Sequence, residues 1–330
     1  DENAELGGSL NYEDDIRINS NSGKNWARKN IKKLENMKNV TVLKRSNVFG
    51  YHDHNYITIS ENCNNKSSNN ITQRMWKVRA KKVILAQGMV ERPIVFSGND
   101  LPGVMLSASV RGYANKYGVL LGKNIVICTN NDDAYRTVLI LHKAGVSIKC
   151  VADLREKTTN EIIKKVQSLG VQILFGHSVS HVSGPGYVKN VEVSALTSEG
   201  RTLPKTTRKI RADLIAMSGG WTPTVNLFSQ SGGKLEWDNV LACFRPSKHF
   251  QNEITIGGCN GTFDFEKSVK EAIDKTKIIM KELDQNKYKD LSLKIESPKL
   301  TRKIKSYWYI DSGKTEEQTD KAFVDFQNDV

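Results

Sequence analysis

The fold is decided by residues 124–153, which run NIVICTNNDDAYRTVLILHKAGVSIKCVAD. The apolar run at 124–128 is bounded by turn residues, as in a buried parallel strand. After the polar turn at 129–133, apolar residues recur at helical spacing up to Gly145, which stands where a helix C-cap is expected. A second apolar run follows at 147–152. The stretch therefore predicts a strand, a helix and a parallel strand joined by a right-handed crossover.

Neighbouring patterns extend this unit in both directions. Downstream, the sequence predicts a helix at 160–169, strands at 171–175 and 214–217, and a hairpin of 177–182 with 188–195. Upstream, it predicts a helix at 30–36 and strands at 40–43, 55–60, 75–80 and 82–86. Polar loops are predicted at 61–70 and around 284–299. A βαβαβ unit, a small antiparallel insert and a returning strand indicate an α/β fold with two dinucleotide-binding domains of the Rossmann type, as in flavoproteins.

The order of these elements gives a domain hypothesis. Residues 1–118 and about 245–282 are assigned to the remainder of a first dinucleotide-binding domain, and 119–244 to a second, inserted one. Residues 283–330 are assigned to a connection with a further domain. The chain opens on DENAELGG without Met and closes on VDFQNDV. We therefore expect it to be truncated at both ends.

Composition excludes several classes of protein. The net charge is +13, but the Lys residues are scattered without a basic block or interleaved aromatics, so no nucleic-acid partner is expected. No apolar run is long enough to cross a bilayer, so no membrane association is expected. The five Cys form no C-x-x-C pair and their odd number fits no disulfide framework. Buried thiols in a reducing cytoplasm are the expected arrangement.

Two strand-to-glycine turns are candidate cofactor-binding elements. The first is Ala86-Gln87-Gly88, which follows an apolar strand and precedes Arg92. It departs from the usual Ala-Thr-Gly by its Gln. The second is Gly257-Gly258, after the strand 254–256 and before a helix from 265. Glycine at such a turn lets the backbone approach a nucleotide. The usual Asp after the second turn is missing, and Gly258-Cys259 stands in its place.

The amino-terminal residues carry a further candidate. Asp1, or the adjacent Glu2, stands where a first Rossmann unit places the carboxylate that binds an adenosine ribose, and Gly7-Gly8 follows at a suitable distance. On spacing alone a solvated acidic terminus is favoured. The later glycine turns place the segment in a flavoprotein-like order and favour cofactor binding.

The turn of the second βαβ unit, in contrast, does not have the pattern of a dinucleotide-binding site. Residues 129–135 lie where G-x-G-x-x-G is expected and contain no glycine. Asp132 and Asp133 would repel a phosphate, and capping of the following helix and compensation of its dipole are their better-founded roles. We therefore expect no NAD in this unit. No Ser-His-Asp set, catalytic carboxylate pair or metal-ligand spacing appears. His52 and His54 have H-x-H spacing, but a surface loop is favoured over a metal site.

A longer run gives a specific resemblance. Residues 91–105, ERPIVFSGNDLPGVM, continue into Arg111, Tyr113, Asn115 and 117–118. This run resembles the α subunit of heterotetrameric sarcosine oxidase, and the resemblance covers essentially the whole chain. The other segments that carry it are 48–51 with 55–56, 129–132 with 134–136, 218–221 with Pro223, and 322–330. Opine and amino-acid dehydrogenase subunits share the Arg-Pro and Leu-Pro-Gly-Val portions.

The resemblance implies a role as a subunit. It implies NAD bound noncovalently by this subunit, FAD on a β subunit where sarcosine is oxidised, and FMN at the α–β interface. Glycine, hydrogen peroxide and methylene-tetrahydrofolate are the implied products, with tetrahydrofolate bound by a further C-terminal domain. The implied partners are β, γ and δ subunits of a heterotetramer, in the cytoplasm. Catalysis is expected on the β subunit, with no catalytic residue in this chain.

Two other functions stay open from the sequence. One is the α subunit of an opine or amino-acid dehydrogenase that passes electrons to a carrier. The other is a non-catalytic scaffold, which the missing glycines of the second unit favour. The segment 102–118, rich in Tyr and containing Arg111, is predicted as an interface or flavin-facing loop, with an ordinary packed connection as the alternative.

Overall fold

The computed structural model describes residues 1–63, 71–285, 291–301, 304–311 and 321–324. The chain divides into two compact units. Unit 1 comprises 1–90, 222–239 and 243–298, and unit 2 comprises 91–221, 240–242 and 299–330. These boundaries differ from the predicted limits at 118 and 244, and the assignment of functions to the domains stays a prediction. Among the described residues, no helix is long and apolar enough to span a membrane.

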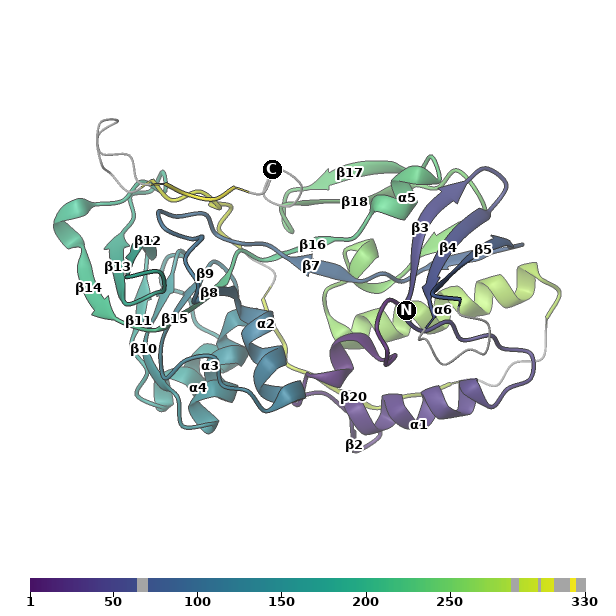
Figure 1. The fold of residues 1–330 in the computed structure, drawn as a ribbon, viewed down its shortest axis with the longest axis horizontal. Helices are drawn as coiled ribbons and strands as arrows, with labels where there is room; N and C mark the ends of the chain where they lie inside the picture. The colour runs from purple at the N-terminus through teal and green to yellow at the C-terminus, as the bar shows by residue number, and fades with distance from the viewer. Residues whose placement is uncertain (64–70, 286–290, 302–303, 312–320, 325–330) are drawn as a thin grey trace. The chain divides into compact units, whose positions relative to one another are not determined.

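Unit 2 is built on a parallel five-stranded sheet of order β11-β10-β9-β15-β8 (Figure 1). The strands are β8 (Val104–Leu106), β9 (Asn124–Thr129), β10 (Ser147–Asp153), β11 (Ile173–Phe175) and β15 (Leu214–Ser218). On one face lie α2 (Ser107–Gly112), η2 (a π-helix, Tyr113–Tyr117), α3 (Asp133–Lys143) and α4 (Glu161–Ser168). The predicted α/β fold of the Rossmann type is confirmed in this unit.

A three-stranded antiparallel sheet covers the other face. It has the order β12-β13-β14 and comprises β12 (His177–Ser183), β13 (Asn190–Ala195) and β14 (Arg208–Arg211), with η3 at Pro204–Thr206. Val179, Val191 and Val193 of this sheet pack in one core with Val126 and Ile215 of the parallel sheet. The predicted hairpin is therefore present, and it packs because its apolar residues alternate toward the parallel strands.

Unit 1 contains smaller sheets. Two of them have two strands: β6 (Val83–Leu85) with β19 (Glu253–Thr255), and β17 (Lys234–Asp238) with β18 (Cys243–Lys248). Strands β3 (Ser46–His52), β4 (Tyr56–Asn62) and β5 (Gln73–Arg79) form an antiparallel meander. A third sheet has the order β2-β1-β20 and comprises β2 (Asn21–Ser22), β1 (Arg17–Ile18) and β20 (Ile295–Glu296). Its helices are η1 (Gly8–Asn11), α1 (Gly23–Glu35), α5 (Asn226–Gln230), η4 (Gly257–Asn260) and α6 (Phe265–Glu282). Strands β7 (Met89–Glu91) and β16 (Trp221–Pro223) form a further two-stranded sheet.

Two of the predicted elements differ from the structure. Residues 40–43 form no strand; the strand begins at Ser46, after Arg45 at a positive φ of 50°. The predicted loop around 284–299 contains the short strand β20. Of the other predicted loop, residues 64–70 lie outside the described part of the chain. The predicted C-cap is confirmed, because α3 ends at Lys143 and Gly145 has a φ of 78°.

Candidate functional site

The two predicted glycine turns meet at one edge of unit 1. Strands β6 and β19 pair in parallel, with Thr255 opposite Leu85, so both turns follow the carboxyl ends. A Cβ on Gly258 would lie 3.0 Å from the carbonyl carbon and 3.2 Å from the Cα of Gly88. A side chain at 258 would therefore push the turns apart. The structure thus brings together Gly88 and Gly258, two residues that the sequence singled out.

The same turns leave open space where a ligand would approach. Gly88 has a φ of 82°, and a Cβ there would meet no atom within 4 Å. Gly257 has a φ of 69°, and its Cβ would meet only Ser268 at 3.8 Å. Ala86 and Gln87 are exposed. Bare backbone outside the carboxyl ends of parallel strands is where α/β folds bind nucleotides, so these residues fit a dinucleotide pyrophosphate.

Three residues that the sequence analysis missed hold the second turn in place. The Glu271 carboxylate of α6 accepts hydrogen bonds from the Gly257 N–H at 2.9 Å and from Asn260 Nδ2. The Thr255 hydroxyl donates to Asn260 Oδ1 at 2.8 Å. Glu271 lies 14 residues after Gly257, in the helix that follows the turn, so the residues of the turn itself could not identify it.

Cys259 occupies the position of the missing carboxylate but turns inward. Its thiol donates to the carbonyl oxygens of Leu85 at 3.0 Å and Ile256 at 3.2 Å. The residue is buried, and burial raises the pKa of the thiol. Cys259 therefore joins the ends of β6 and β19 and leaves the turn without a side chain aimed at a ligand.

The amino-terminal candidates lie in unit 1 in an exposed segment. Asp1 Oδ1 accepts from the Asn3 N–H at 2.9 Å, and Glu2 is exposed. Gly7 and Gly8 have φ values of 123° and 52°, and a Cβ on Gly8 would meet no atom within 4 Å. These geometries are compatible with the predicted ribose and cofactor contacts, which stay predictions.

Arg92 belongs to unit 2 and is engaged there. Its guanidinium donates to the carbonyl oxygens of Ala242 at 2.7 Å, Trp221 at 3.3 Å and Leu241 at 3.4 Å. It also lies 4.3 Å from the ring centroid of Trp308. The residue therefore links distant segments of unit 2, and its predicted cofactor contact stays a prediction.

The turn after β9 in unit 2 is filled by the protein itself. Asp132 is buried, and its carboxylate accepts from Arg155 Nη1 at 2.8 Å, Asn160 Nδ2 at 2.6 Å, and both the N–H and the hydroxyl of Thr301 at 2.7 Å. Asn130 Nδ2 donates to the carbonyl oxygen of Lys305 at 2.8 Å. Residues 299–301 and 304–311, the crossing segment, therefore pass over the carboxyl edge where a nucleotide would bind. This turn does not fit a dinucleotide.

The expected capping role of Asp132 was wrong. No helix N–H donates to its side chain, and the Asp133 N–H instead donates to Asn131 Oδ1 at 2.9 Å. The Asp133 carboxylate pairs with Arg111 at 3.0 Å and Arg136 at 2.9 Å, and these guanidinium groups lower the pKa of Asp133 despite its burial. Arg111, Arg136 and Arg155 therefore form ion pairs with buried carboxylates around the turn. Because these guanidinium groups are already paired, they do not form a phosphate-binding site.

These contacts also bear on the predicted interface segment 102–118. Arg111 is fully buried inside unit 2, so it cannot serve as an exposed contact. Tyr113 and Tyr117 are exposed, with 43% and 62% of their surface accessible. The arginine belongs to a packed connection, and the tyrosines leave the interface hypothesis open.

The two histidines with H-x-H spacing lie in unit 1. His52 ends β3, with its Nε2 3.4 Å from the Thr58 hydroxyl, and His54 stands in the turn at a φ of 60°. Within the described ranges, no cluster of three or more His, Cys, Asp or Glu could hold a metal ion. Cys128, Cys150, Cys243 and Cys259 are buried, as expected of structural thiols, and Cys63 is half-buried.

Comparison with known families gives a match over most of the chain. Residues 9–243 match the family described as pyridine nucleotide-disulphide oxidoreductase. The chain is 35% identical to the sarcosine oxidase subunit alpha of Corynebacterium sp. (strain P-1) over 271 residues, which are 80% of this chain and 28% of that protein. It is 32% identical to the subunit of the same name from Rhizobium meliloti (strain 1021), over 100% of this chain and 32% of that protein. The chain thus spans about a third of the length of these relatives.

Solved structures share the fold at low sequence identity. L-proline dehydrogenase from P. horikoshii aligns with a TM-score of 0.62 and 16% identity over 87% of this chain and 50% of that chain. Thioredoxin reductase from T. acidophilum aligns with a TM-score of 0.56 and 15% identity over 79% of this chain and 81% of that one. Both alignments support the fold class that the sequence predicted.

Proposed function

Because the chain belongs to the pyridine nucleotide-disulphide oxidoreductase family, we propose that it is the nucleotide-binding part of the α subunit of a sarcosine oxidase complex. The observation that carries the proposal is the pair of open glycine turns at the carboxyl ends of β6 and β19. The similarity to two sarcosine oxidase α subunits, 32–35% identical, supports the choice of complex.

In this proposal NAD binds in unit 1. The backbone at Gly88, Gly257 and Gly258, which carries no side chains, would lie against the pyrophosphate of NAD. The Glu271 carboxylate would hold the second turn in place through its hydrogen bond from the Gly257 N–H. Ala86, Gln87, Gly7 and Gly8 would complete the backbone contacts, and Asp1 or Glu2 would accept from the adenosine ribose. Arg92 belongs to unit 2, and its predicted cofactor contact is not part of this site.

The redox chemistry lies outside these residues. We place sarcosine oxidation on FAD of a partner β subunit, and electron transfer to oxygen on FMN at the α–β interface. The CH–NH bond of sarcosine would be oxidised to give glycine, hydrogen peroxide and methylene-tetrahydrofolate. Subunits β, γ and δ and a tetrahydrofolate-binding region complete the proposed cytoplasmic complex. This chain would bind NAD and support assembly.

The test is spectroscopic. The full-length gene is expressed with its genomic neighbours, the complex is purified, and absorbance is recorded while sarcosine is added under air. Flavin bleaching with release of peroxide supports the proposal. A flavin-containing complex that does not react with sarcosine but is reduced by an opine would instead indicate the α subunit of an opine dehydrogenase. A complex with neither flavin nor dinucleotide would leave a scaffold, which the filled turn at Asp132 favours as the second candidate.

Replacing Gly258 with Val is expected to weaken NAD binding at least about tenfold, or about 1.4 kcal/mol. The added side chain would separate the turns, since a Cβ alone would reach 3.0 Å from the Gly88 carbonyl carbon. Calorimetric titration of the full chain with NAD measures the affinity. Gly176→Ala is the control, because Gly176 lies in unit 2 and a Cβ there would meet no atom within 4 Å. Wild-type affinity in a folded Gly258→Val variant would contradict the assignment.

A further inference from the structure

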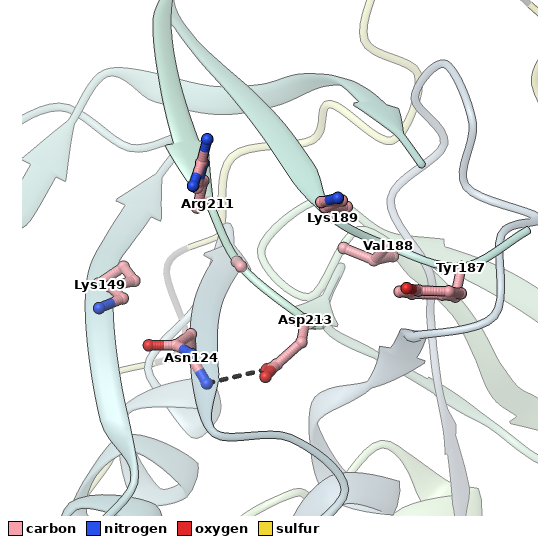
Figure 2. Close-up of a pocket in the computed structure, with 8 residues that line it drawn as sticks. Asn124, Lys149, Tyr187, Val188, Lys189, Arg211 and Asp213 are labelled. Carbon is pink, nitrogen blue, oxygen red and sulfur yellow. Dashed lines mark hydrogen bonds between the residues drawn. The ribbon is translucent and has the colours of Figure 1, made fainter. Parts of the chain in front are cut away.

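A cavity of about 270 Å³ opens at the amino-terminal edge of the parallel sheet in unit 2 (Figure 2). It lies beside Asn124, the first residue of β9, and Asp213, which directly precedes β15. Tyr187 and Lys189 approach it from the segment before β13, and Arg211 ends β14. This edge is opposite to the filled turn after β9, because parallel strands run from one edge to the other. Neither the family nor the proposed NAD site accounts for it.

The cavity is lined by cations without counterions. Lys149, Lys189 and Arg211 reach it from three different strands or their connections. Within the described part of the chain, the side chains of these three residues form no ion pair or hydrogen bond. Elsewhere in unit 2, buried arginines are paired with carboxylates, as Arg155 is with Asp132 and Asp153. Lys149, Lys189 and Arg211 are exposed to solvent, as other cations of this unit are, and what distinguishes them is their position around one cavity.

The single carboxylate in the lining does not neutralise them. Asp213 Oδ1 accepts from the backbone N–H groups of Lys123 at 3.0 Å and Asn124 at 2.8 Å, the latter drawn in Figure 2. Oδ2 accepts from Lys123 N–H at 3.2 Å. These bonds hold Asp213 against the start of β9, so its role is structural. Three cations against one committed carboxylate leave the cavity positive.

Backbone hydrogen bonds hold the residues that line the cavity in place. The Asp213 N–H donates to the Asn124 carbonyl oxygen at 2.9 Å, and the Val188 N–H donates to that of Pro102 at 2.9 Å. Val188 itself is fully buried in the core between the two sheets. The cavity is therefore a preformed feature of the packing, and only the long cationic side chains must be ordered by a ligand, which limits the entropic cost of binding.

We propose that this cavity binds a small polyanion through a phosphate or diphosphate group. A guanidinium fork presents two parallel N–H donors to phosphate oxygens, and Lys ammonium groups add point charges, so Arg211 with Lys149 and Lys189 matches that chemistry. The ring of the exposed Tyr187 borders the cavity and offers a flat face for a nucleoside base. Free diphosphate and the diphosphate of a nucleotide share the proposed anchor.

The test is calorimetric titration of the full chain with pyrophosphate at low ionic strength. The double variant Lys189→Ala/Arg211→Ala is expected to bind pyrophosphate at least about tenfold more weakly, since it loses the guanidinium fork and one of the two ammonium groups of the proposed anchor. The matched control is Lys164→Ala/Lys165→Ala, which removes two exposed cations of α4 away from the cavity. The control is expected to keep the wild-type affinity.

Equal weakening in both double variants would show nonspecific attraction by net charge and would overturn the proposal, as would no binding by the wild type. Titration with ADP separates the sources of the ligand. Tighter binding of ADP than of pyrophosphate, lost in Lys189→Ala/Arg211→Ala, identifies a nucleotide; equal affinities identify diphosphate alone. NAD binding in unit 1 is expected to be unchanged in this variant, so failure here is distinguishable from failure of the proposed function.

Discussion

Replacing Asp132 with Ala is expected to lower the free energy of unfolding by about 3–5 kcal/mol, the range for removing one partner of a buried ion pair. The carboxylate accepts four hydrogen bonds from Arg155, Asn160 and Thr301, and its side chain is inaccessible to solvent. Without it, the Arg155 guanidinium keeps only Asp153, and two donors of Thr301 lose their acceptor. The substitution therefore removes contacts to Arg155 after β10, to the N-cap residue of α4 and to the crossing segment.

Urea denaturation followed by circular dichroism measures this loss. Asp100→Ala is the matched control, because Asp100 is exposed in the same unit and the change in charge is identical. Asp132→Asn keeps the shape but donates through one amide, so an intermediate loss is expected. An Asp132→Ala variant within about 1 kcal/mol of wild type would show that the crossing segment is held elsewhere.

The parallel core could be predicted from the sequence because its signals are local. Strands β9, β10, β11 and β15 match the predicted apolar runs to within about two residues, since strands buried on both faces need uninterrupted apolar residues. The turns at Gly88 and Gly257 were found for the same reason: a strand followed by glycine is visible in a short window.

Contacts between distant segments could not be predicted in this way. Asp132 carries a capping pattern, yet its partners include Thr301, far along the chain, and these outcompete the helix N–H groups. The run 40–43 has strand composition but forms no strand; the Leu43 carbonyl instead accepts a hydrogen bond from the backbone nitrogen of Asp1. Glu271 and Arg92 likewise owe their roles to tertiary neighbours, which spacing along the sequence does not reveal.

Replacing Glu91 with Gln is expected to remove a pH dependence of stability between about pH 5 and pH 8. Glu91 is buried at 5% exposure, and burial together with the nearby Asp133 raises its pKa from 4.5 to about 8. The Ser218 hydroxyl, Arg111 and the Ala108 N–H, which donates to Oε2 at 2.8 Å, act in the opposite direction but are outweighed. Within the described residues, Oε1 has no hydrogen-bond partner of good geometry.

The sign follows from proton binding. Between the unfolded value near 4.5 and the folded value of about 8, the folded chain holds a proton that the unfolded chain releases, so stability falls as pH rises. At about 1.4 kcal/mol per pH unit, the loss approaches about 4 kcal/mol from pH 5 to pH 8 and then levels off. Gln keeps the neutral shape at every pH, so Glu91→Gln should match wild type at pH 5 and exceed it at pH 9.

Thermal unfolding of both proteins from pH 5 to pH 9 tests this, and the difference between the two curves cancels the titration of other groups. Glu156→Gln serves as the control, since Glu156 is exposed in the same unit and its replacement should leave the wild-type profile unchanged. Parallel pH profiles for wild type and Glu91→Gln would mean that the carboxylate is charged in the folded chain and is compensated by Arg111. If the stabilities of wild type and Glu91→Gln become equal as the pH falls, Glu91 is protonated in the folded chain beside the arginine-paired Asp133. Two acidic side chains then share one buried site because only one of them is charged.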